Sequence, residues 1–318
     1  MDASISYEGI REAATLIDPV FRDSPQFVSE PLSARLGVEV VLKVESVNPI
    51  RSFKGRGTEY LLEKLDPNPH GFVCASAGNF GQGMAYAGRK RGVPITVFAA
   101  LTANPMKIER MRALGARVEL VGDDFEAAKD AATRHAEQTG AFYVEDGLLG
   151  AIGEGAGTIA AELTRMEGTL DAVVVPLGNG SLINGIGTWL RRESPATRVI
   201  AVCPAGAPSM EISWREHRLV ETKKVETIAD GIAVRVPVAE ALDIMRDTVD
   251  DVMLVSDEQI IEAMRWLHQD TGLVVEPAGA AGVAAIAVRK ADWNGKRVAT
   301  PLTGGNLTPE QYRRWLVA

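Results

Sequence analysis

The sequence predicts an α/β fold with two open, mostly parallel sheets, each flanked by helices. Short apolar runs alternate with helical patterns from 71 to 140, and the same alternation resumes from 150. Strands that alternate with helices over short connections favour parallel sheets with right-handed crossovers. A chain of 318 residues is also long enough for two domains, each with a sizeable hydrophobic core.

The N-terminal part of the chain is expected to form an arm, followed by a first strand and helix. A short amphipathic helix is predicted at Tyr7–Leu16, and prolines break the segment after it into loops. The alternating run Val38–Glu45 predicts a strand, and a helical pattern follows it through Leu65. Three further strands each precede a helix that ends at a glycine, which suits the left-handed position just past a helix. These strands are expected at Phe72–Ala75, Pro94–Ala99 and Ala116–Val121.

The second half of the chain continues the alternation with one interruption. A helix is expected from 150 to 166, and the segment 204–230 has no regular pattern. Further strands are predicted at Asp171–Pro176, Arg198–Cys203, Val252–Val255 and Arg297–Leu302. Further helices are predicted at Leu182–Arg192, Asp257–Thr271 and Ala278–Lys290, with a last short helix capped by Thr308.

Composition and charge limit the classes of partner that the protein can bind. A net charge of -8 argues against binding to nucleic acid or to an anionic membrane, because both favour a basic surface. No N-terminal segment combines a basic start with an apolar core, and no apolar run is long enough to span a bilayer, so we expect a cytoplasmic protein. Cys74 and Cys203 lie in apolar runs and are expected to be buried thiols. The four histidines lack the spacing of metal ligands.

A candidate chemical centre lies in the stretch Asn48-Pro49-Ile50-Arg51-Ser52-Phe53-Lys54-Gly55-Arg56-Gly57. Ser52 is expected to be the N-cap of the following helix, which puts Lys54 in its first turn. A positive charge there is unfavourable, because the helix dipole is positive at the N-terminus. Such a site, when partly desolvated, lowers the pKa of a lysine and makes its amine available for a Schiff base. The alternative interpretation is a solvated lysine at a strand–helix junction.

Two further turns have the character of anion sites. Gly178-Asn179-Gly180-Ser181 lies between a predicted strand and a helix, where backbone amides can bind a phosphate. An ordinary strand–helix turn also favours glycine, and the Rossmann fingerprint is not satisfied here. Ser76-Ala77-Gly78-Asn79 has the same setting and could bind a smaller anion, such as an amino-acid carboxylate. A helix cap is the alternative for that turn.

Four stretches in order resemble one known family. The lysine stretch is similar to the pyridoxal-phosphate (PLP) motif of the threonine dehydratase and serine racemase group, in the tryptophan synthase β-subunit superfamily (fold type II). The other matching stretches are Ser76–Asn79, Gly178–Leu182 and Thr303-Gly304-Gly305-Asn306. The resemblance implies PLP as the cofactor and a homodimer. It places residues 1–69 and 148–318 in a large PLP-binding domain and residues 70–147 in a small mobile domain.

The resemblance also implies a role for each matching residue. Lys54 would hold the cofactor covalently and act as the catalytic base, Asn79 would contact the ring hydroxyl, and Thr303 would be the partner of the pyridine nitrogen. A hydroxyl at that nitrogen suits elimination at Cβ, because it does not force protonation of the ring. Phe53 is expected to pack against the ring or simply in the core, and Glu276 to lie near the cofactor. The phosphate would be bound by Gly178, Asn179, Gly180, Ser181 and Leu182, and the substrate carboxylate by Ser76, Ala77, Gly78 and Asn79.

Departures from the family pattern narrow these expectations. Serine racemases have a second serine where this chain has Ala77, so efficient racemisation is not expected. Cation-binding members have an aspartate where Ser209 falls, so no metal site is predicted. Many dehydratases have histidine at Phe80, and the sequence alone assigns this change no chemical role. Arg51 replaces a usual glycine; it could reach a second substrate carboxylate, but a solvated side chain is the favoured interpretation.

The predicted function is that of a PLP-dependent amino-acid lyase. It would eliminate water from a small-molecule substrate of the L-threonine or L-serine type and release a 2-oxo acid and ammonia. One alternative is β-elimination or β-replacement on another β-substituted amino acid: phenylserine, hydroxyaspartate, or a substrate of the cysteine or threonine synthase kind. A non-catalytic binder of PLP or amino acids is disfavoured, because no residue that the chemistry requires is missing.

Overall fold

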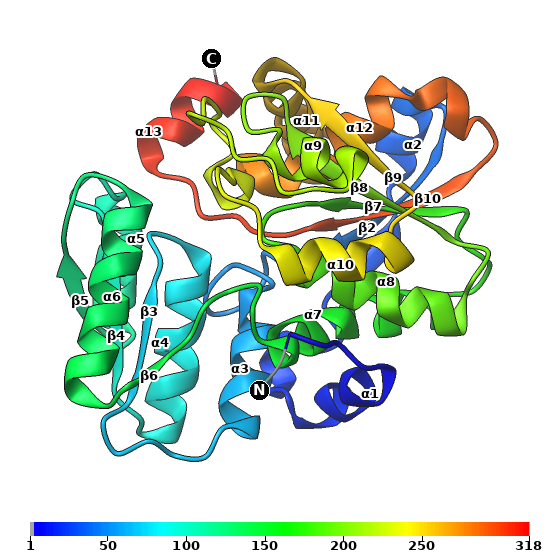
Figure 1. The fold of residues 1–318 in the computed structure, drawn as a ribbon. Helices are drawn as coiled ribbons and strands as arrows, with labels where there is room; N and C mark the ends of the chain where they lie inside the picture. The colour runs from blue at the N-terminus through cyan, green and yellow to red at the C-terminus, as the bar shows by residue number, and fades with distance from the viewer. Residues whose placement is uncertain (1–2, 318) are drawn as a thin grey trace.

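The computed structural model describes residues 3–317 and contains two sheets with helices packed around them (Figure 1). The strands of the larger sheet are β1 (Gln26–Val28), β2 (Glu39–Val44), β7 (Ala172–Pro176), β8 (Arg198–Pro204), β9 (Asp251–Val255) and β10 (Arg297–Leu302). They lie in the order β1-β2-β10-β7-β8-β9. Only the pairing of β1 with β2 is antiparallel within this sheet. The last strand of the chain therefore lies in the middle of the sheet.

Helices cover both faces of the larger sheet, so its strands are apolar on both sides. Val40 and Leu42 pack on one face and Val41 packs on the other, as the alternation of side chains along a strand requires. The first face is covered by α2 (Glu30–Leu36), α11 (Asp257–Thr271), α12 (Pro277–Val288) and η4 (Arg313–Val317). The second face is covered by α7 (Gly150–Leu163), α8 (Ser181–Glu193) and α10 (Ala239–Thr248).

The smaller sheet is wholly parallel. Its strands are β3 (Phe72–Ala75), β4 (Ile95–Ala99), β5 (Arg117–Leu120) and β6 (Phe142–Tyr143), in the order β5-β4-β3-β6. The helices packed on it are α4 (Asn79–Arg91), α5 (Pro105–Ala113) and α6 (Phe125–Thr139). Cys74 and Met84 share the core on the α4 side, whereas Val73 and Ala128 share the core on the α6 side.

One helix lies between the helices of the two sheets. α3 (Lys54–Lys64) packs against α4 on one side and against α7 on the other (Figure 1). The remaining elements are α1 (Tyr7–Leu16), η1 (Pro19–Phe21), α9 (Ser209–Glu216), η2 (Asp230–Ile232), η3 (Lys290–Trp293) and α13 (Pro309–Tyr312). None of the helices in the described part of the chain has the length and apolar character that a membrane crossing needs.

The structure confirms the α/β fold class and each of the predicted strands to within two residues at either end. It adds β6, whose two residues give too short a run for a sequence pattern, and α10, which begins without a side-chain cap. It also adds α9 inside the segment that lacked a regular pattern. The expectation of loops after the first helix was wrong, because η1, β1 and α2 lie there and Pro31 fits the first turn of α2. Cys74 and Cys203 are free and buried, as expected, and burial raises the pKa of both thiols to about 12.

Candidate active site

The lysine stretch forms the junction between β2 and α3. The helix begins at Lys54 and its N-cap is Phe53, so the prediction of Ser52 as the N-cap was wrong by one position. The Ser52 hydroxyl still accepts a hydrogen bond from the Lys54 amide, at 3.3 Å. Both Ser52 Oγ and the Phe53 amide donate to the carbonyl of Thr303, at 3.2 and 3.0 Å. The start of α3 is therefore fastened to the end of β10.

The amine of Lys54 lies among two aromatic rings and one carboxylate. Its Nζ is 4.7 Å from the centre of the Phe53 ring and 5.8 Å from that of the Phe80 ring. It is 2.5 Å from Oδ2 of Asp146, and the lysine side chain is 16% exposed. Lys54 is therefore mostly enclosed, and the solvated-lysine interpretation does not describe its position.

Asp146 joins Lys54 to the glycine turn between β7 and α8. Its Oδ1 accepts a hydrogen bond from Ser181 Oγ at 3.0 Å, and its carbonyl accepts one from Asn179 Nδ2 at 3.2 Å. The structure thus brings the predicted lysine and the predicted phosphate turn to opposite sides of one carboxylate. Sequence reasoning missed Asp146, because the strand before it, β6, is only two residues long.

The glycine turn offers a set of backbone amides with no acceptor in the described chain. Gly180 has a φ of 98° and is the N-cap of α8, which has no side-chain cap. Within residues 3–317, no amide from 178 to 183 donates a hydrogen bond, and the first one that does is Asn184, to Gly180. A Cβ on Gly180 would lie 2.6 Å from the Cβ of Ala241. Free amides at the positive end of a helix dipole form an anion-binding site.

A second polar cluster surrounds Asn79 at the start of α4. Its Nδ2 donates to Glu276 Oε1 at 2.5 Å, and its Oδ1 accepts from Asn306 Nδ2 at 2.8 Å. Burial raises the pKa of Glu276, although the charge of Lys107 opposes the shift. The other oxygen of Glu276 is buried and has no hydrogen-bond partner among residues 3–317. The cluster therefore retains unused hydrogen-bonding capacity beside the site.

The turn from Ser76 to Asn79 combines a serine hydroxyl that accepts hydrogen bonds with free amides. Ser76 Oγ accepts from the amides of Gly78 and Gly81, at 3.2 and 3.0 Å, so this hydroxyl satisfies one amide in the first turn of α4, whose N-cap is Gly78. The amides of Ala77 and Asn79 donate no hydrogen bond in the described part of the chain. They are available to a small anion.

The remaining predicted residues lie at the carboxyl ends of the strands of the larger sheet or in the core beneath them. Thr303 follows β10 and is 4% exposed, and its hydroxyl has no partner within the described residues. Leu182 packs its side chain into the core of the larger sheet, so only its amide can face an anion. Phe53 packs partly against the same core while it also lies under the Lys54 amine. No group of three or more histidine, cysteine, aspartate or glutamate residues within 3–317 is placed to hold a metal ion.

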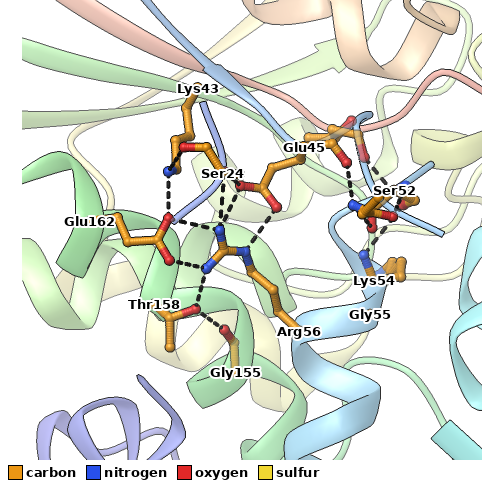
Figure 2. Close-up of polar contacts among 12 residues, drawn as sticks. Ser24, Lys43, Glu45, Ser52, Lys54, Gly55, Arg56, Gly155, Thr158 and Glu162 are labelled. Carbon is orange, nitrogen blue, oxygen red and sulfur yellow. Dashed lines mark hydrogen bonds and ion pairs between the residues drawn. The ribbon is translucent and has the colours of Figure 1, made fainter. Parts of the chain in front are cut away.

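A buried network of ions lies close to Lys54 along α3 (Figure 2). Arg56, two residues further along α3, donates from Nε to Glu45 at 2.8 Å and from Nη1 to Glu162 at 2.6 Å. Lys43 Nζ donates to Glu162 as well and to the carbonyl of Ser24 at 2.8 Å. Burial acts to raise the pKa of Glu162, but Arg56 and Lys43 outweigh it and lower the pKa to about 2. The network fixes α3 to β2 and to α7.

These residues fit PLP. A lysine amine, a cradle of free amides for a phosphate, an aromatic ring and an unpartnered threonine hydroxyl all follow the carboxyl ends of parallel strands, where ligands bind in open α/β sheets. The fold and site thus define an enzyme that uses PLP. The chain belongs to the pyridoxal-phosphate dependent enzyme family, whose family model matches residues 17–304.

Comparisons with individual proteins agree with this family. The L-threonine ammonia-lyase of Thermotoga maritima is 36% identical over 305 residues, which cover 95% of this chain and 76% of that protein. The L-threo-3-hydroxyaspartate ammonia-lyase of a Pseudomonas species is 32% identical over 309 residues, which cover 96% and 97% of the two chains. Among solved structures, maize serine racemase superposes with a TM-score of 0.92 at 27% identity, covering 98% of this chain and 96% of that one.

Proposed function

We propose that the protein is a lyase that removes water from a β-hydroxy amino acid of the L-threonine or L-serine type and releases a 2-oxo acid and ammonia. One observation carries the proposal. The Lys54 amine lies between the glycine turn, which it reaches through Asp146, and the turn that bears Asn79 and Phe80. Relatives named as L-threonine ammonia-lyases support the proposal, because they are 36% identical over most of the chain.

The cofactor would be held by residues from both sheets. PLP supplies, when bound, the electron-withdrawing ring that makes the α-proton of an amino acid removable. In our proposal Lys54 holds it covalently, and the amides of Gly178, Asn179, Gly180 and Leu182 bind its phosphate together with Ser181. Asn79 contacts its ring hydroxyl and Thr303 its pyridine nitrogen. Phe53 packs against the ring, and Glu276 supports Asn79 through the hydrogen bond between their side chains.

The chain's own residues would then move one proton and orient one substrate. The substrate amine would first displace Lys54 from the cofactor. The freed Lys54 Nζ would then accept the α-proton as general base, and the carboxylate of Asp146 would stabilise the resulting ammonium. The turn Ser76, Ala77, Gly78 and Asn79 binds the substrate carboxylate through its free amides. The hydroxyl group leaves from Cβ. The water lost in this step is regained when the released unsaturated amine hydrolyses, so the net product is the 2-oxo acid and ammonia.

The test is a steady-state assay for 2-oxo acid with the PLP-loaded protein. L-threonine, L-serine and L-threo-phenylserine are compared, and Lys54→Ala serves as the inactive reference. We expect 2-oxo acid and ammonia in equal amounts from at least one of these substrates. A product that forms only when a thiol nucleophile is added supports β-replacement instead. A Lys54→Ala protein with unchanged biological activity supports the non-catalytic binder.

We further propose that residues 70–147 form a small domain that closes over a large domain of residues 1–69 and 148–318, and that the protein is a cytoplasmic homodimer. The family resemblance supports the domain division and the dimer, and the charge of -8 suits a protein that avoids nucleic acid and anionic membranes. Light scattering at twice the monomer mass tests the dimer. A decrease in the radius of gyration on addition of substrate analogue tests the closure.

A further inference from the structure

Arg51 has a backbone conformation that glycine would adopt with less strain. Its φ is 54°, in the left-handed region that a side chain disfavours. Hydrogen bonds hold it there: its amide donates to the Asn48 carbonyl and its carbonyl accepts from the Gly305 amide, each at 3.0 Å. A strained residue that is fixed on both sides within an active-site turn points to a function for its side chain.

A second arginine reaches the same corner from the smaller sheet. Arg110 of α5 contacts Asn306 Oδ1, and Asn306 Nδ2 donates to Asn79 Oδ1 at 2.8 Å. The guanidinium is therefore one side chain away from Asn79, which belongs to the turn proposed for the substrate carboxylate. Arg110 is partly buried, so its charge is not fully solvated, whereas the Arg51 side chain is exposed, as the favoured interpretation expected.

Neither Arg51 nor Arg110 has a carboxylate counter-ion in the described part of the chain. Two neighbours of Arg110 on α5 do have one. Lys107 pairs with Asp230 at 2.6 Å and Arg112 pairs with Glu109 at 2.8 Å. Burial and the positive charge of Arg51 both lower the pKa of Arg110, so the two charges repel each other. The acid that acts on Arg110 is Glu276, but burial favours its neutral form. This corner therefore favours an incoming anion.

We propose that Arg51 and Arg110 bind an anionic group on the side chain of the substrate, next to the turn that holds its α-carboxylate. The proposal rests on the proposed elimination reaction and narrows its substrate to a β-substituted amino acid with a second acidic group. Guanidinium groups bind carboxylates and phosphates through paired hydrogen bonds. One amino acid with a second carboxylate is 3-hydroxyaspartate, which would lose water at Cβ and yield oxaloacetate and ammonia after hydrolysis. One with a phosphate instead is O-phosphoserine, which would lose phosphate at Cβ and yield pyruvate and ammonia after hydrolysis.

The first experiment measures selectivity in the PLP-loaded enzyme. kcat/KM is determined for L-threonine, L-threo-3-hydroxyaspartate and O-phospho-L-serine, with the wild type, Arg51→Gly, Arg110→Ala and the control Arg112→Ala. We expect the wild type to prefer one of the two acidic substrates, and the one preferred identifies the anion as carboxylate or phosphate. The ratio of kcat/KM for that substrate over threonine should fall about 10- to 100-fold in Arg51→Gly and Arg110→Ala. Arg112→Ala should keep the wild-type ratio.

The second experiment needs no turnover and separates this proposal from the proposed function. L-aspartate, O-phospho-L-serine and L-alanine are titrated into the loaded enzyme, and the absorbance change gives each Kd. Tighter binding of an acidic ligand than of alanine, lost in both arginine variants, supports the subsite even if no substrate is turned over. Turnover of threonine with equal affinities for all three ligands overturns the subsite and leaves the lyase proposal standing. Arg51→Gly should unfold at the wild-type temperature or above, because glycine relieves the strain at a φ of 54°.

Discussion

The buried ion network around Arg56 leads us to predict a large loss of stability for Glu162→Gln. Both oxygens of Glu162 accept hydrogen bonds from Arg56, at 2.6 and 2.8 Å, and one of them accepts from Lys43 as well. An amide of the same shape keeps one acceptor and turns an NH2 group toward these cations. Glu45 would then be the only carboxylate facing two buried cations in the network, and the site would carry a net positive charge.

Two arguments give the same magnitude for this loss. Removing one partner of a buried ion pair costs about 3 to 5 kcal/mol. The pKa of Glu162, lowered from 4.5 to about 2, corresponds to about 3 kcal/mol at about 1.4 kcal/mol per pKa unit. Because the folded-state pKa lies below the unfolded-state value, this stability is complete above pH 4.5 and is lost as the pH falls toward 2. The difference between wild type and variant should therefore shrink by about half at pH 3.

The assay is urea unfolding at pH 7 and pH 3, at one fixed PLP concentration, followed by far-UV circular dichroism and tryptophan fluorescence. Glu226→Gln is the matched control, because Glu226 is 66% exposed and pairs with the exposed Lys224 at the surface. We expect the control to lose less than about 1 kcal/mol. Glu162→Gln within about 1 kcal/mol of the wild type at pH 7, or an equal difference at both pH values, would refute the reasoning.

Three further predictions concern the site itself. Lys54→Ala should lose the visible absorbance of covalently bound cofactor and the borohydride-stable label while its far-UV circular dichroism stays that of the wild type; a retained label would contradict the assignment. Ser181→Ala should raise the Kd for PLP about 10-fold in a fluorescence titration, because a hydroxyl contact to the phosphate is lost, and an unchanged Kd would exclude that contact. Gly180→Ala should lower the free energy of unfolding by about 1 to 3 kcal/mol, since its φ is 98° and its Cβ would meet Ala241. Gly295→Ala, where a Cβ meets nothing within 4 Å, is the control and should lose less in the same urea experiment.

The parts of the site that sequence could predict are those with local signals. Lys54 and the glycine turn at Gly180 each follow a short apolar run and open a helical pattern. About ten neighbouring residues are therefore enough to predict that each lies at a strand–helix junction. The alternation of strands and helices is local in the same sense and predicted the two sheets. The helix boundary at Phe53 was misplaced by one residue, because Ser52 has the chemistry of a cap but donates its own proton to Thr303.

The residues that sequence could not predict are those whose role depends on distant contacts. Asp146 is one acidic residue among 42 until the fold brings it to Lys54 and Ser181. Arg110 lies on a helix with two other basic residues, and only its contact with Asn306 distinguishes it. Arg56 belongs to the lysine motif, but its burial between two carboxylates follows from the packing of α3 against α7.

The fastening of α3 to the end of β10 has a consequence for biosynthesis. Ser52 and Ile50 each bond to partners more than 250 positions later in the chain, and β10 is inserted between β2 and β7. A ribosome must release the chain as far as Asn306 before the pocket around Lys54 can close, so contacts of such high sequence separation delay its assembly. PLP binding is thus a late step in the folding of a newly made molecule. C-terminal truncations that remove Thr303 should accumulate as colourless protein.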